Sequence, residues 1–443
     1  MTNESTLVAN ISSRLKIKAL NEMQLAAVKA IQENDELILL SATGSGKTLA
    51  FLIPILNSLD PEIKMIQALI LVPSRELALQ IEEVLKKIQA GFKITACYGG
   101  HKREIEENNL VQPPAIIIAT PGRMADHIRR KNVDLAFVKF LVLDEFDKSL
   151  ELGFLEEMEF ILQSLPPTVK KRMLTSATFA VDIPAFTQMK NAVTLNFFNP
   201  NGSRSEALTI KTVRSPDNDK LETLLNLICY LKNTSTIIFC NHRESVERTS
   251  NYLSGKGIVN VFYHGGMEQQ EREVALVKFK NTSADILVTT DLASRGLDIA
   301  NIRSIIHYHL PATEDAFVHR NGRTARMDAT GNVYIIISPE EEIPSYIKDS
   351  SENLNLDPGL PLPEKPKWST LFIAAGKKDK VNKIDIVGFL SNKGQLKKDE
   401  IGLVDVKDFS SFAAVRKSKV GHVLELIKNE KIKNKKVKID IAR

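Results

Sequence analysis

The sequence has few cysteines and no long hydrophobic run. Three cysteines, Cys97, Cys229 and Cys240, are scattered over 443 residues without the spacing of a metal site or a disulfide framework. No apolar stretch approaches the length of a membrane span, and residues 1–17 lack the apolar core of a signal peptide. We therefore expect no membrane association and a reducing, cytoplasmic setting in which the three thiols are plain core residues.

The composition is that of a soluble globular protein, and its charge is unevenly distributed. Hydrophobic residues make up 43% and charged residues 26% of a chain long enough for two or three domains. Residues 371–443 hold 18 Lys and Arg against 9 Asp and Glu, a net charge of +9, which leaves −4 for the remainder. Such a basic segment indicates a polyanionic partner, for which we expect nucleic acid, with a lysine-rich solvated surface as the alternative.

Residues 37–48, LILLSATGSGKT, are typical of a loop that binds nucleotide phosphates. Four apolar residues fit a buried strand, a glycine-rich turn follows, and an amphipathic segment begins at Leu49. Glycines let the backbone wrap a phosphate chain, and a helix amino terminus offers free N–H groups. Ser41 stands where the strict pattern has glycine, so an ordinary glycine turn is the alternative. The residues expected to hold phosphates and Mg²⁺ are Thr43, Gly44, Ser45, Gly46, Lys47 and Thr48.

A second apolar strand, at residues 140–143, ends in two carboxylates. With a phosphate loop upstream, Asp144 is expected to hold Mg²⁺ and Glu145 to orient or deprotonate the attacking water. Without such a loop, the pair would be interpreted as a solvated turn. The two segments together predict a site for a nucleoside triphosphate.

Apolar strands alternate with helical segments in two successive series, which predicts two parallel-sheet α/β lobes. Strands are expected at 37–40, 68–72, 115–119, 140–143 and 172–175, and then at 236–239, 260–263, 285–289, 304–307 and 333–337. Ligands of such folds gather at the carboxyl ends of the strands. The expected boundaries are 1–195 for the first lobe, 196–218 for a linker, 219–350 for the second lobe, 351–370 for a proline-rich spacer and 371–443 for a small domain.

The segment HRNGRTAR, residues 319–326, carries two arginines and a histidine in the second lobe. A helix would place His319, Gly322, Arg323 and Arg326 on one face, because they fall at i, i+3, i+4 and i+7. Such a stripe is costly unless it meets anions. We therefore expect the second lobe to supply arginine fingers to a nucleotide held by the first.

The last segment, residues 371–443, is predicted to follow the order strand, helix, strand, strand, helix, strand. Strands are expected at 384–389, 403–406, 411–415 and 436–441, and helices at 395–400 and 421–428. This order describes a small α+β domain.

Taken together, these motifs resemble those of the DEAD-box RNA helicases over nearly all of residues 15–340. ATGSGKT, PSRELALQ, the Gly99–Gly100 pair, TPGR, DEFD, SAT, TDLASRGLDI and HRNGRTAR occur in the family's order and at about its spacing. The tail from residue 376 looks like the RNA-binding domain of the DbpA-type branch, whose members are associated with a hairpin of large-subunit ribosomal RNA. The resemblance implies two tandem RecA-like lobes followed by a domain similar to an RNA-recognition motif.

The resemblance also implies roles for single residues. Gln24 matches the glutamine that reads adenine, Asp298 matches the residue that contacts ribose, and Arg323 and Arg326 match the fingers on the γ-phosphate. Lobe coupling falls to Ser176, Thr178 and His319. The residues expected to hold the RNA backbone are Pro73, Arg75, Gly100, Thr120, Gly122, Arg123, Arg272 and Thr290.

The chain departs from the family pattern in three places. Ile17 stands where the family has an aromatic residue that stacks on adenine, which weakens the expected nucleotide affinity or adenine preference. Phe146 stands at the position of the alanine in the DEAD motif, so the contact of Asp147 with the SAT segment is expected to differ from that in the family. In the tail, Phe412 keeps one stacking position and Ile386 is expected to be its partner on the first strand. We therefore expect RNA recognition through lysine-rich loops, with Phe412 as a core residue being the alternative.

The resemblance implies an RNA-dependent ATPase and helicase that uses ATP and Mg²⁺ and separates short RNA duplexes locally. We expect a monomer that acts on structured ribosomal RNA during ribosome assembly. Two alternatives stay open: a non-catalytic RNA clamp, which Ile17 and Phe146 favour, and a DNA-directed motor of related fold.

Overall fold

The computed structural model describes residues 3–42, 44–100, 103–177, 183–198, 208–291, 302–324, 331–348, 351–357 and 359–442. The described residues form two compact units, one up to residue 198 and one from residue 208 onward. The first unit holds one seven-stranded sheet, and the second holds a seven-stranded sheet and a four-stranded sheet. Across these ranges, no helix combines the length and apolar character that crossing a membrane requires.

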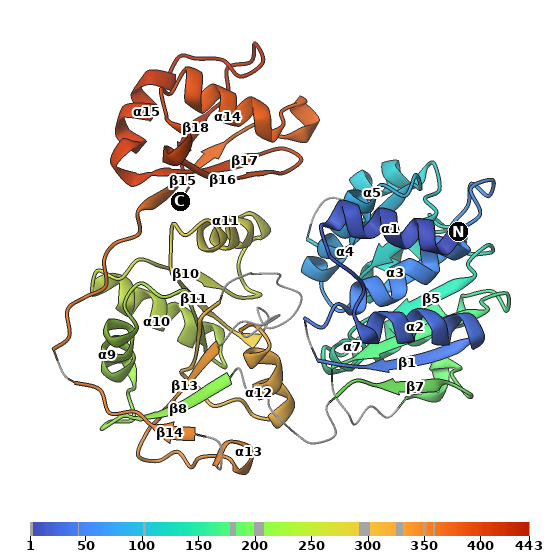
Figure 1. The fold of residues 1–443 in the computed structure, drawn as a ribbon, viewed down its shortest axis with the longest axis horizontal. Helices are drawn as coiled ribbons and strands as arrows, with labels where there is room; N and C mark the ends of the chain where they lie inside the picture. Colours follow the sequence, from blue (N-terminus) through green and yellow to red (C-terminus); the bar gives the residue numbers. More distant parts are fainter. Residues whose placement is uncertain are drawn as a thin grey trace. The chain divides into compact units, whose positions relative to one another are not determined.

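The first unit is built on a parallel sheet with the strand order β3-β4-β2-β5-β6-β1-β7 (Figure 1). The strands are β1 (Glu36–Leu40), β2 (Ala68–Leu71), β3 (Ile94–Cys97), β4 (Ile116–Ala119), β5 (Phe140–Leu143), β6 (Lys171–Ser176) and β7 (Val193–Asn196). The helices are α1 (Asn3–Leu15), α2 (Glu22–Glu33), α3 (Lys47–Ser58), α4 (Arg75–Ile88), α5 (Arg103–Leu110), α6 (Pro121–Arg129), α7 (Phe146–Glu151) and α8 (Leu155–Gln163).

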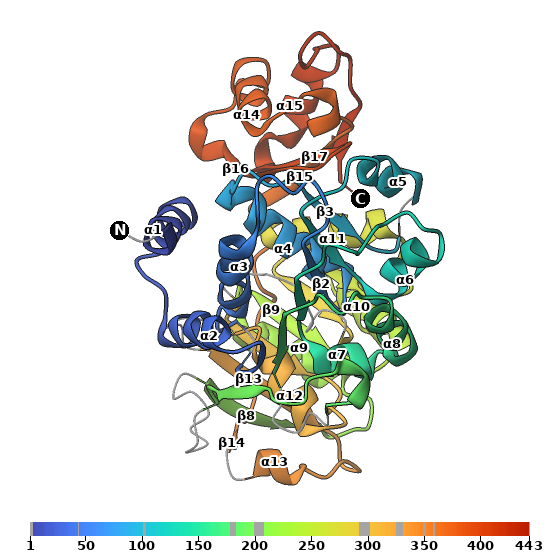
Figure 2. The same cartoon turned by 90° about the vertical axis from the view of Figure 1, so that its right-hand side faces the viewer.

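Helices cover both faces of this sheet. Successive strand residues point to opposite faces, so Leu37 and Leu39 join a core with α1 to α4, whereas Ile38 and Leu40 join a core with α6 to α8. Figure 2 shows α1 to α3 on one side of the strands and α6 to α8 on the other. Because both faces are buried, the strands are continuous apolar runs rather than alternating ones.

The five strands expected in this lobe are confirmed to within two residues at their ends, and two further strands were missed. β3 is only half-buried along its length, and its sequence, ITAC, has no apolar run. β7 forms one edge of the sheet and alternates partly buried with exposed residues. Each is therefore too short and too mixed to stand out by composition.

The large sheet of the second unit is also parallel, in the order β10-β11-β9-β12-β13-β8-β14. Its strands are β8 (Leu208–Arg214), β9 (Thr236–Phe239), β10 (Asn260–Tyr263), β11 (Ile286–Thr289), β12 (Ser304–His307), β13 (Gly331–Ile337) and β14 (Ser351–Asn353). Its helices are α9 (Leu221–Leu231), α10 (Arg243–Gly255), α11 (Gln269–Lys280), α12 (Glu314–Asn321) and α13 (Ser345–Lys348).

All five strands expected in the second lobe are present, but the expected linker is too long. Residues 208–214 form β8, which pairs with β13 over seven residues. β14 lies within the expected spacer and adds to the edge formed by β8. The polar composition of β8 hid it, since alternate residues of an outer strand can face solvent.

The small sheet is antiparallel, in the order β16-β17-β15-β18. Its elements are β15 (Trp368–Ile373), α14 (Lys383–Asn392), β16 (Ile401–Val406), β17 (Ser411–Arg416), α15 (Val420–Ile427) and β18 (Ile439–Ile441). Both helices pack on one face of the sheet through a shared apolar core (Figure 1). The alternating order of strands and helices is as expected, but the chain enters it earlier than the sequence indicated.

Two segments of this domain were assigned wrongly. Residues 384–389, expected to be the first strand, lie within α14, and the true first strand, β15, begins inside the expected spacer. Asn382 caps α14 with a capping box to Asp385, and Ile386, Phe389 and Leu390 are buried at helical spacing. Residues 395–400 form no α-helix; within them, only Lys398–Glu400 form a short 3-10 helix.

Candidate nucleotide site and nucleic-acid interface

The glycine-rich loop joins the end of β1 to the start of α3. Gly44 and Gly46 have φ values of 81° and 92°, which L-residues rarely adopt, and Gly46 occupies the N-cap of α3. Lys47 and Thr48 therefore begin the helix, whose first N–H groups face the loop. Thr43 lies outside the described residues. The geometry is that of the expected phosphate loop.

Lys47 is folded into this loop and is only 7% exposed. Its Nζ donates to the carbonyl oxygens of Ser41 at 2.5 Å and Ala42 at 3.1 Å. The Ser41 hydroxyl lies 2.8 Å from the hydroxyl of Ser45. Ser41 has a negative φ, so this position does not require the glycine of the strict pattern.

Gln24 contacts the loop from α2. Its Nε2 donates to the Gly46 carbonyl at 3.1 Å, while its Oε1 accepts from the N–H of Asn21 in a capping box. The Asn21 Nδ2 donates to the Ser45 carbonyl at 2.9 Å. The start of α2 is thus bonded to the phosphate loop at two points. Ile17 packs as a partly buried residue against the core of this lobe.

Asp144 and Glu145 follow β5 and are joined through Thr175 of β6. The Thr175 hydroxyl donates to the Asp144 Oδ1 at 2.5 Å and accepts from the Glu145 N–H at 3.1 Å. Burial raises the pKa of the Asp144 carboxyl above its usual value, because little water reaches it. A buried carboxylate near the Lys47 ammonium supplies an oxygen ligand of the kind that Mg²⁺ prefers, and the Thr48 hydroxyl at the start of α3 is another, so the residue types fit that ion.

Phe146 is fully buried and occupies the core beneath α7 and α8, with its ring centroid 6.4 Å from that of Phe186. The space that this bulk requires is therefore supplied by the core, without disturbing the hydrogen bonds of Asp144. Asp147 is also buried, and burial raises its pKa. Ser176 ends β6 and its carbonyl accepts from the Ser41 N–H at 3.1 Å. Thr178 lies outside the described residues.

The expected RNA residues of the first lobe sit in three segments that follow β2, β3 and β4. Pro73 precedes α4, and the guanidinium of Arg75 lies 4.7 Å from the ring centroid of Tyr98. Arg75 Nη1 also donates to the Gly100 carbonyl at 3.5 Å. In the third segment, Thr120 is the N-cap of α6, and Gly122 and Arg123 lie in its first turn. The parallel sheet brings the three segments together at one edge.

The second lobe bears out only part of the arginine stripe. α12 ends at Asn321, so Gly322 is its C-cap and Arg323 lies beyond the helix. The single helical face expected for His319, Gly322 and Arg323 is therefore wrong, because the helix ends at Asn321, before Arg323. His319 and Arg323 are both buried. Arg326 and Asp298 lie outside the described residues, Arg272 lies on α11, and Thr290 directly follows β11.

A buried arginine that the sequence did not single out organises this lobe. Arg320 is 1% exposed, and its Nε and Nη2 donate to both carboxylate oxygens of Asp291, at 2.6 and 3.0 Å. It also donates to the His309 carbonyl at 2.9 Å and to the Asn241 Oδ1 at 2.8 Å. These partners follow β9, β11 and β12. Their position at the carboxyl ends of neighbouring strands was the available signal.

Two aromatic residues of the small domain, Phe372 and Phe412, are covered by α11. Phe372 of β15 pairs with Phe412 of β17, with ring centroids 5.6 Å apart, and Phe412 is only 1% exposed. Phe412 and Phe372 pack with Val274 and Val277 of α11. Ile386, the expected partner of Phe412, lies instead in the core on α14. This agrees with the alternative that Phe412 is a core residue.

The fold and the site define a class before any comparison is made: a nucleotide-binding protein with two parallel α/β lobes and a small α+β domain. Residues 21–185 match the DEAD/DEAH box helicase family, residues 219–328 the helicase conserved C-terminal domain, and residues 370–441 the DbpA RNA binding domain.

The same assignment follows from whole proteins. The ATP-dependent RNA helicase DbpA of Bacillus subtilis is 31% identical over 95% of this chain and 94% of its own, and that of Escherichia coli is 29% identical over all of both. Among solved structures, S. cerevisiae Dbp5 bound to RNA and ADP BeF3 has a TM-score of 0.67 at 27% identity, over 77% of this chain and 88% of that one. Mss116 bound to ssRNA and UDP-BeF has a TM-score of 0.71 at 26% identity, over 79% and 78%.

The chain belongs to the DEAD-box ATP-dependent RNA helicases of the DbpA type, a family of RNA-stimulated ATPases. Its two large sheets are RecA-like lobes.

Proposed function

We propose that this chain is a monomeric, cytoplasmic enzyme that couples RNA-stimulated ATP hydrolysis to local separation of short RNA duplexes during ribosome assembly. The observation that carries the proposal is the connected site of the first lobe. There Lys47, the pair Asp144 and Glu145, and Gln24 all meet the phosphate loop or the strand ends beside it. These are the parts that phosphoryl transfer to water requires.

Each part has a distinct chemical role in this proposal. Lys47 and the N–H groups of α3 hold the phosphates, Thr48 and Asp144 hold Mg²⁺, and Glu145 orients the attacking water. When bound, Mg²⁺ neutralises charge that develops between the β- and γ-phosphates. From the second lobe, Arg323 and Arg326 contact the γ-phosphate and Asp298 the ribose. Ser176, Thr178 and His319 link nucleotide state to RNA.

RNA stimulates hydrolysis in this proposal because it binds both lobes. The first lobe offers Arg75, Gly100 and Arg123, with Pro73, Thr120 and Gly122, and the second offers Arg272 and Thr290. These groups suit phosphates and sugars and carry little sequence information. Arginine fingers are worth roughly 10³–10⁵ in rate, so delivering Arg323 and Arg326 only with RNA bound would keep hydrolysis slow in its absence.

The small domain supplies the preference for structured ribosomal RNA in this proposal, through its lysines. Two lysine-rich segments, 377–383 and 431–438, lie against each other: Lys433 contacts Asp385 at 2.8 Å and the Lys380 carbonyl at 2.6 Å, and Lys435 contacts Asp379 at 3.2 Å. Since α11 covers Phe412, phosphate contacts outweigh base stacking. The exposed lysines of these two segments are Lys377, Lys378, Lys380, Lys383, Lys431, Lys433, Lys435, Lys436 and Lys438.

Steady-state ATPase and duplex separation test the proposal together. ATPase is measured without RNA, with generic single-stranded RNA and with ribosomal RNA, and the last should stimulate most. Glu145→Gln should abolish strand separation under turnover conditions. If Glu145→Gln separates strands as well as the natural chain, or if no RNA stimulates hydrolysis, the catalytic proposal fails and the RNA clamp replaces it. Equal stimulation by DNA would favour a DNA-directed motor.

A paired charge removal tests the targeting. Lys377→Ala with Lys378→Ala should abolish the preference for ribosomal RNA and leave stimulation by generic RNA. The matched control removes two exposed lysines from the first lobe, Lys86→Ala with Lys87→Ala, and should keep the preference. If both pairs behave alike, the lysine-rich segments do not direct the enzyme.

A further inference from the structure

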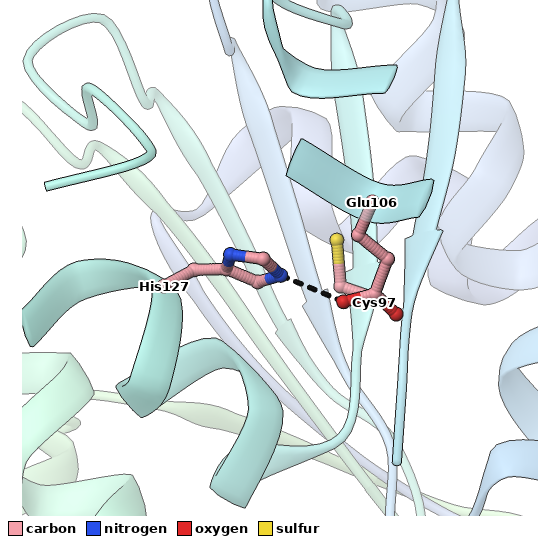
Figure 3. A group of neighbouring side chains, drawn as sticks. All are labelled: Cys97, Glu106 and His127. Carbon is pink, nitrogen blue, oxygen red and sulfur yellow. Dashed lines mark hydrogen bonds and ion pairs between the residues drawn. The ribbon is translucent and has the colours of Figure 1, made fainter. Parts of the chain in front are cut away.

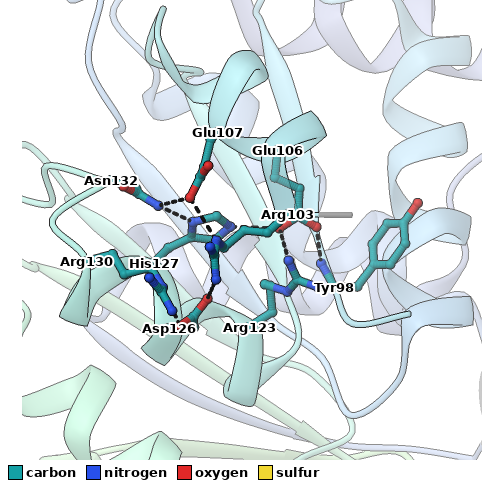
Figure 4. A network of polar contacts seen from close by, with 9 residues as sticks. All are labelled: Tyr98, Arg103, Glu106, Glu107, Arg123, Asp126, His127, Arg130 and Asn132. Carbon is teal, nitrogen blue, oxygen red and sulfur yellow. Dashed lines mark hydrogen bonds and ion pairs between the residues drawn. The ribbon is translucent and has the colours of Figure 1, made fainter. Parts of the chain in front are cut away.

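A buried carboxylate, Glu106 of α5, lies beside Arg123, one of the expected RNA residues of the first lobe (Figure 4). Its side chain is 2% exposed. Oε2 accepts from the Arg123 Nη1 at 3.2 Å and from the His127 Nε2 at 2.7 Å, and Oε1 accepts from the Tyr98 N–H at 2.9 Å. A carboxylate is tolerated in such a place only when charged and hydrogen-bonding partners replace its water.

These contacts join the three segments that carry RNA residues. Arg123 belongs to the TPGR segment at the start of α6. Tyr98 lies two residues before Gly100, and its ring supports the guanidinium of Arg75 at 4.7 Å. Arg75 in turn donates to the Gly100 carbonyl. One carboxylate therefore fixes Arg123 directly, and fixes the backbone on which Arg75 and Gly100 are arranged.

His127 donates a hydrogen bond to Glu106 through the proton on its Nε2. Asn132 donates through Nδ2 to the His127 Nδ1 at 3.1 Å and to the Glu107 Oε1 at 3.2 Å. Because Nδ1 accepts, the neutral imidazole carries its proton on Nε2 and donates it to Glu106. The Glu106 carboxylate thus faces a neutral donor on one side and the Arg123 cation on the other.

The same corner has the residue types of a metal site, but its contacts oppose one. The ligand atoms of Cys97, Glu106 and His127 lie within 4.8 Å of one another (Figure 3). A metal would need the thiolate and the free Nε2 lone pair. Burial raises the pKa of the Cys97 thiol, Nε2 carries a proton, and the Arg123 cation already contacts the Glu106 oxygen. The cluster is therefore a hydrogen-bonded support.

We propose that Glu106 is a positioning residue for RNA binding: it holds Arg123, and the Tyr98 to Gly100 backbone beside it, in the orientation that meets RNA phosphates. This inference rests on the proposed RNA role of Arg123. A positioning role predicts weaker RNA binding when Glu106 is changed, with hydrolysis at saturating RNA nearly intact, because the hydrogen bonds described above join Glu106 to the RNA segments.

The test uses the full chain with Glu106→Gln. This change replaces one carboxylate oxygen by an NH₂ group, which cannot accept the hydrogen bonds that the oxygen accepted. ATPase is measured against the concentration of single-stranded RNA. Glu106→Gln should raise the half-saturating RNA concentration about fivefold to tenfold, the size of a coupling between contacting residues, with kcat within about twofold. The control is Glu104→Gln on the same helix, an exposed carboxylate. It should leave the half-saturating concentration within about twofold.

A double-mutant cycle separates positioning from folding. In an Arg123→Ala background, the effect of Glu106→Gln on the half-saturating RNA concentration should be clearly smaller, because only the bond to the Tyr98 N–H remains to be lost. An equal effect in both backgrounds would mean that Glu106 acts through the fold, and the inference is overturned. Should Glu106→Gln not fold, Glu106→Asp keeps the charge but withdraws it by one methylene, and the same cycle applies to it.

Failure of the inference differs from failure of the proposed function. If Arg123→Ala raises the half-saturating RNA concentration but neither Glu106 variant does, only the positioning role is wrong. If Arg123→Ala itself changes nothing, the proposed RNA contact is wrong and the positioning role falls with it.

Discussion

Replacing Gly46 by alanine tests the contact between the phosphate loop and Gln24. Gly46 has a φ of 92°, where an L-residue costs about 1–2 kcal/mol. A Cβ there would lie 2.5 Å from the Gln24 Nε2, so the amide must move away and lose its bond to the Gly46 carbonyl. That bond contributes about 0.5–1.5 kcal/mol. Gly46→Ala should therefore lower the opening free energy of α3 by about 1.5–3.5 kcal/mol.

Two other glycines separate strain from collision. Gly91 has a φ of 83°, and an added Cβ meets nothing within 4 Å, so Gly91→Ala should cost only the strain, about 1–2 kcal/mol in its own segment. Gly421 lies in α15 with open space around it and no positive φ. Gly421→Ala should stabilise α15 by roughly 0.5–1 kcal/mol.

Hydrogen exchange of the full chain measures these local opening free energies by mass spectrometry, on peptides from α2 and α3 for Gly46, from the segment between α4 and β3 for Gly91, and from α15 for Gly421. A global unfolding free energy is poorly defined for a chain of several domains, whereas local opening is not. In a Gln24→Ala background the excess cost of Gly46→Ala over Gly91→Ala should disappear. Two results would show that the contact between Gln24 and Gly46 does not constrain the loop. One is that Gly46→Ala costs no more than Gly91→Ala in the natural chain, and the other is that its extra cost persists in the Gln24→Ala background.

Three further predictions follow from buried groups and exposed charges. Thr175→Val removes the hydroxyl that joins Asp144 to the Glu145 N–H. It should lower RNA-stimulated kcat about tenfold to a hundredfold, which is the contribution of a hydrogen bond to a charged group. Because such assays scatter by roughly twofold, a decrease of less than about threefold would contradict this prediction. Burial and the nearby Arg320 lower the pKa of His307 to about 3. The pKa of His307 in the folded state lies below the unfolded value of about 6.5. The stability that the neutral imidazole contributes to the folded state is therefore present above pH 6.5 and is lost as the pH falls toward 3. The opening free energy of β12, measured by hydrogen exchange, should fall over this pH range, and His307→Phe should reduce its dependence on pH. Equal slopes against pH in the natural chain and in the variant would contradict the role given to His307. Finally, Lys377→Ala with Lys378→Ala should reduce the slope of log affinity against log salt by about 1.4 if both lysines neutralise single-stranded phosphates, and an unchanged slope would exclude them.

The strands of both lobes were predictable because a parallel sheet buries both faces. Runs such as FLVL at β5 are apolar throughout and end in polar or small residues, so composition alone locates them. The same rule fails at the outer strands. β3, β7 and β8 each expose part of their surface, and their pattern does not differ from that of a loop with a few apolar residues.

The error at α14 has a local cause. The sequence IDIVGFL begins with apolar and polar residues in alternation, which is typical of a strand, and the β-branched residues support that interpretation. The capping box of Asn382 and Asp385 overrides this preference by satisfying the first N–H groups of a helix. A search for an Asn followed by Asp at three residues would have found the helix start.

The nucleotide site was predictable where motif residues are close in sequence, and unpredictable where their partners are distant. Lys47 contacts Ser41 within its own loop, as the motif implies. Glu106 meets His127 across 21 residues, and Arg320 meets Asn241 across 79. Only the strand order of each sheet brings such pairs together. A buried charge gives no signal in sequence unless the topology is known.

The four bonds of Arg320 have a consequence for how this lobe can vary between relatives. Its fork matches the two oxygens of Asp291 and leaves further N–H groups for Asn241 and the His309 carbonyl, which the single ammonium of a lysine cannot reproduce. A change at position 291 removes the charged partner of a buried cation, a change at 241 removes one of its hydrogen bonds, and a change at 320 removes two bonds from the Asp291 carboxylate. These three positions should therefore covary as one unit in an alignment of related helicases, more tightly than any of them varies with its neighbours in the chain.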